Sequence, residues 1–145
     1  MHAREWLNTD DRFIAGAELF RSDRAFTVWA YTISHSQLLL RTRTRIGQSR
    51  IDIVFKPVLA VKLRIEYRDG LVIRCAHQTE AEQIRAENTD LDPSDGARYL
   101  ILETGEDRDY VVTYAVGWEE DTATDSDPSK LADFVPGTDP ARILP

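Results

Sequence analysis

The distribution of apolar residues along the chain predicts β-strands through its middle part. Aromatic and β-branched residues gather in four runs, at 26–33, 50–55, 58–67 and 71–76, and this composition favours strands. Pro57 separates the second run from the third. Because proline has no backbone N–H to donate, we expect a bulge, a sheet edge or a short turn at that position.

Two hairpins are predicted from turn residues between apolar runs. The Asp-Gly pair at 69–70 stands between the runs 65–67 and 71–73, and Asp-Gly favours a tight two-residue turn. A short connection that contains glycine joins the segments 98–103 and 109–118, which fits a second hairpin. Together with the earlier runs, these segments bring the expected number of strands to about seven.

One or two short helices are expected beside the strands. The segment 79–88 has no glycine or proline, and Thr79 and Glu82 have the spacing of a capping box. The segment 11–20 also places apolar residues at helical spacing. Its Gly16 would cost about 1 kcal/mol relative to alanine inside a helix.

These elements predict a mainly β fold of the α+β class. We expect a mostly antiparallel, curled sheet that forms either a barrel or a sandwich, whereas the alternating β-α units of a parallel nucleotide-binding sheet are absent. We expect one β-rich domain at 1–118, followed by an acidic, proline-containing tail at 119–145. The tail would be partly disordered or docked on the domain, and its candidate docking residues are Leu131, Phe134 and Val135.

Length and composition fit a single globular domain. The chain has 145 residues, of which 42% are hydrophobic and 30% are charged, and this length can bury one core. No apolar stretch approaches the roughly 20 residues of a membrane span. Because the N-terminal segment has no secretory pattern and a single cysteine cannot form an internal disulfide, we expect a cytoplasmic protein without membrane contact.

Charge is distributed unevenly along the chain. Residues 1–77 contain 13 Lys/Arg and 8 Asp/Glu, whereas residues 78–145 contain 5 and 17. Such asymmetry indicates either an internal electrostatic match or two faces with different partners. The net charge of −7 argues against general nucleic-acid binding, because attraction to phosphates supplies most non-specific affinity.

Three arginines follow a run of three leucines at every second position. In an extended strand Arg41, Arg43 and Arg45 would share one face, with Leu38 and Leu40 on the other. They are the candidate anion or partner contacts. Three interpretations stay open: a solvated strand face, internal pairing with the acidic half of the chain, or a site for an external anion.

No residue pattern nominates a catalytic, cofactor or metal site. Neighbours on an extended chain diverge, so Ser34, His35 and Ser36 cannot form their own dyad and are expected to connect two strands. Cys75 alternates with apolar residues, which predicts a buried thiol. The three histidines lack zinc spacing. An enzyme whose site is assembled from dispersed residues stays an alternative.

The segments 26–41, 50–56 and 70–74 resemble a family of small uncharacterised β-rich proteins from actinobacteria. The resemblance covers about the first half of the chain and implies no activity, cofactor or site residue. Small acidic β-rich proteins of such bacteria include immunity proteins for secreted toxins. The leading hypothesis is therefore a non-enzymatic module that binds a protein partner, and an anion-binding β-barrel is the alternative.

Overall fold

The computed structural model describes residues 3–7, 10–94, 96–129 and 131. It confirms the mainly β fold class, although the described part contains nine strands rather than about seven. The strands are β1 (Ala3–Leu7), β2 (Glu18–Ser22), β3 (Phe26–Thr32), β4 (Gln37–Thr42), β5 (Arg50–Lys62), β6 (Glu66–Tyr67), β7 (Leu71–Cys75), β8 (Arg98–Thr104) and β9 (Asp107–Asp121). The helical elements are α1 (Gln78–Glu87) and the 3-10 turns η1 (Asp10–Arg12) and η2 (Ile33–His35).

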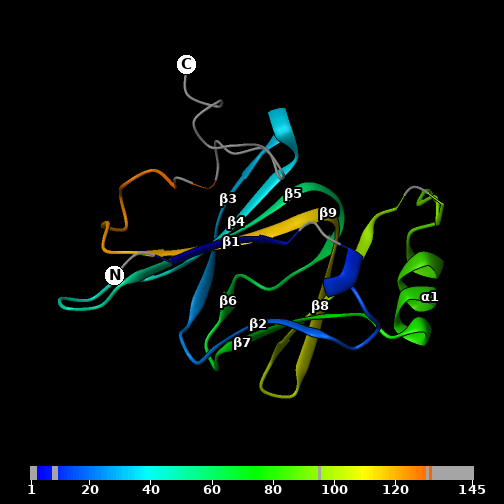
Figure 1. Cartoon of the computed structure of the whole chain (residues 1–145), viewed down its shortest axis with the longest axis horizontal. Coiled ribbons are helices and arrows are strands. Elements are labelled where there is room, and N and C mark those ends of the chain that lie inside the picture. Colours follow the sequence, from blue (N-terminus) through cyan, green and yellow to red (C-terminus); the bar gives the residue numbers. More distant parts are fainter. Residues whose placement is uncertain (1–2, 8–9, 95, 130, 132–145) are drawn as a thin grey trace.

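All nine strands belong to one antiparallel sheet (Figure 1). Its order is β2-β7-β8-β9-β5-β4-β3-β6, and β1 pairs with the C-terminal half of β9. The sheet curls but does not close into a barrel, since β2 and β6 end the order without pairing with each other. The long strands β5 and β9 lie at its centre and pair along most of their length.

The inner face of the curl holds the main hydrophobic core. Leu40, Ile53, Phe55, Ile73 and Leu100 are all fully buried there. Successive residues of a strand point to opposite faces, so a strand covered on both sides is apolar at consecutive positions. The outer face of the sheet is also covered, at two places.

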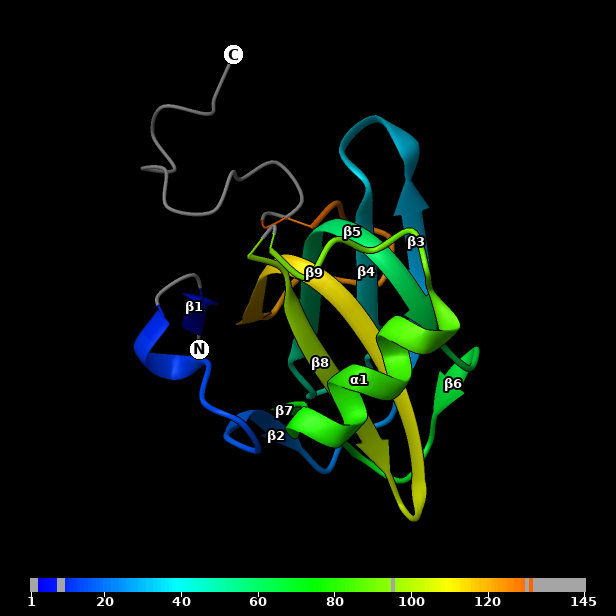
Figure 2. The same ribbon diagram turned by 90° about the vertical axis from the view of Figure 1, so that its right-hand side faces the viewer.

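Two smaller clusters cover the outer face. Helix α1 lies across β8 and β9 (Figure 2) and packs Ile84 against Ile101 and Val112. Elsewhere on the same outer face, Leu39 and Val54 pack with Leu131.

One predicted hairpin is confirmed and the other is wrong. Strands β8 and β9 pair directly across the turn at 105–106. Strands β6 and β7 do not pair with each other, because β6 pairs with β3 whereas β7 lies between β2 and β8. The Asp-Gly signal marks a real turn, in which Gly70 has a φ of +84°. This turn joins strands from opposite parts of the sheet.

One predicted helix is confirmed and the other is wrong. Helix α1 occupies the predicted segment, but its first turn is capped at His77, whose backbone N–H donates to the Glu80 carboxylate at 2.9 Å. The segment 11–20 instead begins in η1 and ends in β2. Gly16 has a φ of +79°, and a Cβ there would lie 2.4 Å from the His77 ring. A helix is incompatible with that conformation.

The predicted interruption at Pro57 is not a break in the strand. Strand β5 continues through Pro57, whose carbonyl accepts a hydrogen bond of 2.7 Å from the Thr113 hydroxyl. The register between β5 and β9 shifts one step later, between Val58 and Ala60. The bulge therefore lies just beyond the proline.

Candidate functional site

The predicted row of three arginines does not exist. Strand β4 ends at Thr42, so Arg43 and Arg45 lie in the loop that leads to β5. Both are exposed, whereas Arg41 is only 2% exposed. The alternation itself holds up to that point, since Leu38 and Leu40 face the main core. The row is lost because the strand ends before Arg43.

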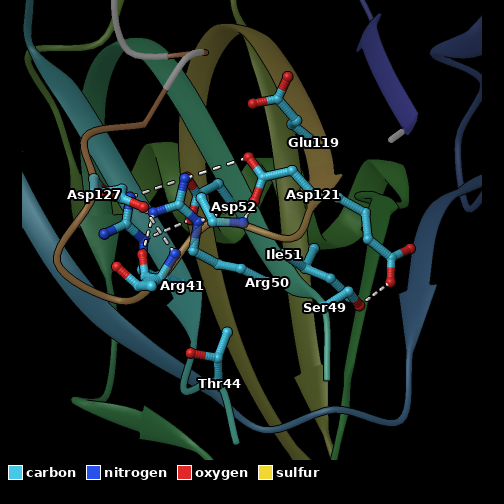
Figure 3. Close-up of polar contacts among 12 residues, drawn as sticks. Arg41, Thr44, Ser49, Arg50, Ile51, Asp52, Glu119, Asp121 and Asp127 are labelled. Atoms are coloured by element: carbon cyan, nitrogen blue, oxygen red, sulfur yellow. Dashed lines mark hydrogen bonds and ion pairs between the residues drawn. The ribbon is translucent and has the colours of Figure 1, made fainter. Parts of the chain in front are cut away.

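Arg41 is buried because the neighbouring strand supplies its counter-ion. The register between β4 and β5 places Arg41 opposite Asp52, and two nitrogens of the guanidinium group donate to the two carboxylate oxygens at 2.7 and 3.0 Å (Figure 3). The guanidinium carbon also lies 5.1 Å from the centre of the Trp29 ring, a cation–π distance. The carbonyl of Asp125 accepts a third hydrogen bond at 2.7 Å.

Arg50 forms the second half of the same buried network (Figure 3). Its side chain is 1% exposed, and its Nε lies 3.3 Å from a carboxylate oxygen of Asp121. One guanidinium nitrogen donates to the carbonyls of Thr124 and Asp127, each at 2.7 Å. We call residues 122–129 the C-terminal strap. The two arginines hold this strap by its backbone.

The strap extends the domain beyond the predicted boundary. Strand β9 runs to Asp121, so the boundary at 118 falls inside a strand. Of the candidate docking residues, Leu131 is fully buried against Leu39 and Val54. Phe134 and Val135 lie outside the described residues. Internal pairing of Arg41 thus involves Asp52 from the first half of the chain and a backbone carbonyl from the second.

A cavity opens between β2 and the C-terminal end of β9. Its volume is about 990 Å³. We call it the acidic groove. Six apolar side chains and seven charged ones line it: Leu19, Phe20, Ile51, Leu71, Val72 and Trp118, with Glu5, Asp23, Asp69, Glu103, Glu120, Arg21 and Arg24. Five carboxylates thus face two guanidinium groups over an apolar lining.

The fold brings these side chains together from distant parts of the chain. Phe20 of β2 lies against Trp118 of β9, with 5.7 Å between ring centres, and so connects the two sides of the groove. The turn before β7 approaches β2 closely, since a Cβ on Gly70 would lie 2.9 Å from the Ser22 carbonyl oxygen. Glycine at this position allows Asp69 to stand beside the end of β2.

Some of the groove carboxylates form internal ion pairs or hydrogen bonds, and others do not. Glu103 forms ion pairs with Arg74 and Arg108, and Glu5 accepts a hydrogen bond of 3.3 Å from the Trp118 indole. Asp23 and Asp69 are exposed and have no hydrogen-bonded or ionic side-chain partner among the described residues. These two carboxylates are available to a ligand.

A second cavity adjoins the groove and has the opposite charge. Its volume is about 380 Å³, and four arginines line it: Arg24, Arg43, Arg45 and Arg68. We call it the basic pocket. Arg43 and Arg45, two of the three arginines of the predicted row, line this pocket from a loop and not from a strand.

Among the described residues, the side chains that the sequence analysis considered for nucleophilic or metal chemistry lie outside the groove and the pocket. Ser34 and His35 lie in η2 and Ser36 follows it, which confirms the predicted connection between β3 and β4. Burial raises the pKa of the Cys75 thiol. No group of three or more His, Cys, Asp or Glu side chains is placed to hold a metal ion among these residues.

No helix in the described ranges is both long and apolar enough to cross a membrane. Comparison of the chain with protein-family models, curated proteins and solved structures finds no match. The resemblance to small actinobacterial proteins therefore stays a prediction.

Proposed function

We propose that this protein is a non-enzymatic interaction module that binds a basic segment of a partner protein in the acidic groove. The single observation that carries this proposal is the lining of the groove, where five carboxylates and two arginines surround an apolar surface. Lysine and arginine side chains match such a lining, because their stems cover apolar surface while their heads reach carboxylates.

Electrostatics support this choice of partner. The chain carries a net charge of −7, and a cleft with an excess of one sign of charge attracts the opposite charge from a distance. Asp23 and Asp69 have no internal ion pair to break among the described residues. A basic partner can therefore pair with these two carboxylates without breaking an existing ion pair. Because salt screens this attraction, the association rate should fall as the salt concentration rises.

An immunity-like role is the form of this function that we favour. An inhibitor of a basic toxin needs a preformed acidic surface and fast association, and steering by charge supplies that speed. The cytoplasmic location expected from the sequence suits such a protein, which must meet the toxin inside the cell.

The test compares capture of partners by matched charge variants. Immobilised wild-type protein and the Asp23→Lys/Asp69→Lys variant are incubated with native lysate of the source organism, and bound proteins are quantified by mass spectrometry. We expect a partner bound by the wild type to be reduced about tenfold or more by the variant, because two attractive contacts become repulsive.

The control is the Asp90→Lys/Glu82→Lys variant. Both residues are exposed on or beside α1, outside the groove lining, and the substitution changes the net charge by the same amount. It should capture the partner as the wild type does. Equal capture by the groove variant, or equal loss in the control, would contradict the proposal.

A further inference from the structure

The basic pocket is built by the register of three strands. Phe26 of β3 lies opposite Thr42 of β4 and also opposite Tyr67 of β6. In an antiparallel pair, one strand runs backward as the other runs forward. Arg43, after Thr42, and Arg68, after Tyr67, are therefore level with Ala25, the residue before Phe26. Arg43 and Arg68 therefore flank the start of β3, next to Arg24. Three arginines from three connecting segments converge for this reason.

Two of the four arginines form no ion pair within the described residues. Arg43 and Arg45 are exposed, and no carboxylate oxygen in the described ranges lies within 4.0 Å of either guanidinium group. Arg68 pairs with Glu66 at 2.7 Å, but its side chain is 80% exposed, and such exposed pairs contribute little. Arg24 donates to the Ser49 carbonyl at 2.7 Å, which fixes its position without neutralising its charge.

The pocket keeps a positive excess in an acidic protein. Its lining includes four arginines but only two carboxylates, Asp23 and Glu66. Like charges at one place repel one another, so this arrangement costs free energy unless an anion is bound. Arg41, whose charge is neutralised by Asp52, illustrates the alternative that the chain uses elsewhere. Among the described residues, Arg43 and Arg45 have no such ion pair, and Asp125 interacts with Arg43 only beyond ion-pair distance.

We propose that the basic pocket binds the phosphate group of a small phosphorylated molecule. Guanidinium groups present paired N–H donors that match phosphate oxygens, and Thr27 and Gln48 in the lining add neutral donors. A volume of about 380 Å³ lies within the range of small-ligand sites, roughly 300–1,000 Å³.

The surroundings favour a small ligand over a nucleic acid. The acidic groove adjoins the pocket and shares Asp23 and Arg24 with it. A polyanion that continued along the surface from the pocket would meet the groove carboxylates, which repel phosphates. A single phosphate group stays inside the pocket and avoids them.

The experiment is a titration of ¹⁵N-labelled full-length protein with inorganic phosphate and with AMP, followed by NMR at physiological ionic strength. Adenosine serves as the uncharged control. We expect saturable shifts for phosphate and AMP at the amides of 24–27, 43–48 and 66–68, and no such shifts with adenosine. Absence of saturation up to about 20 mM, far weaker than most specific sites, would overturn the proposal.

Matched variants separate this pocket from general attraction to arginine. The Arg43→Gln/Arg45→Gln variant changes only exposed loop residues, and we expect it to bind AMP about tenfold more weakly or worse. The Arg85→Gln/Arg108→Gln variant loses the same charge outside the pocket and should bind as the wild type does. Equal weakening in both variants would overturn the proposal, and the wild-type shift pattern decides the matter if a variant fails to fold.

The last part of the experiment tests whether the pocket prefers a nucleic acid. If a short oligodeoxythymidylate bound more tightly than AMP, the ligand would be a nucleic acid, and the assignment to a small molecule would be wrong. The Asp69→Lys variant should retain phosphate binding, since it changes a groove carboxylate that does not line the pocket. Failure of the phosphate site is thus distinguishable from failure of the proposed interaction groove.

Discussion

At the scale of single residues, the most consequential contacts are those that bury two arginines. Asp52 contacts both of them, since its carboxylate binds Arg41 at 2.7 Å and lies 3.8 Å from Arg50. The strap carbonyls accept the remaining N–H groups. The chain compensates the desolvation of these charges within the network, which also attaches the strap to the sheet.

We predict that Asp52→Asn lowers the free energy of unfolding by about 3–5 kcal/mol, because removal of one partner leaves buried charge without compensation. Urea denaturation measures the change. Asp69→Asn is the matched control, since Asp69 is exposed, and it should stay within about 0.5 kcal/mol of the wild type. Equal stability of the two variants would mean that the network contributes nothing.

The sequence predicted correctly on which face of the sheet these side chains lie, but it did not predict that Arg41 is buried. Alternation placed Leu38 and Leu40 inward and Arg41 on the opposite face, as observed. Whether Arg41 meets solvent depends on the partner that the strand register brings opposite it, here Asp52. The alternation of residues along one strand cannot predict which residue of the neighbouring strand lies opposite.

At the scale of elements, an ion pair attaches α1 to the sheet. Two guanidinium nitrogens of Arg74 on β7 donate to the two Glu80 carboxylate oxygens, each at 2.8 Å. These hydrogen bonds, together with the backbone N–H of His77, lower the pKa of Glu80 from 4.5 to about 2. The first turn of the helix is thereby fixed to β7.

A pH dependence follows from this shift. Because the pKa of Glu80 is lower in the folded state, its stabilisation is complete above about pH 4.5 and is lost as the pH falls toward 2. We predict that Glu80→Gln is less stable than the wild type at pH 7 and that the difference shrinks through this window. Urea midpoints at successive pH values measure it. A difference that is constant with pH would contradict the assignment.

Local signals predicted elements better than they predicted neighbours. The helix at α1 and the hairpin of β8 and β9 depend on adjacent residues and were found. The segment 11–20 misled because Phe13, Ala17 and Phe20 do face the core, but from a loop and a strand. Helical spacing of core contacts is therefore not sufficient for a helix when Gly16 needs a positive φ.

At the scale of the whole molecule, the fold class followed from the sequence and the candidate site did not. Apolar runs and turns were enough to indicate one curled antiparallel sheet. The carboxylates of the acidic groove stand far apart in the sequence, at 5, 23, 69, 103 and 120. Only the curl of the sheet brings them together, so no local pattern could nominate them. The charge asymmetry indicated faces of different sign without locating either.

The most direct test of the central claim is photo-cross-linking inside cells of the source organism. A benzophenone amino acid replaces Arg21, which lines the groove and whose loss leaves all five groove carboxylates in place. The control replaces Thr89, an exposed residue after α1. The account predicts a discrete adduct with a basic protein from position 21 and none from position 89. No adduct at position 21, or the same adduct from both positions, would contradict it.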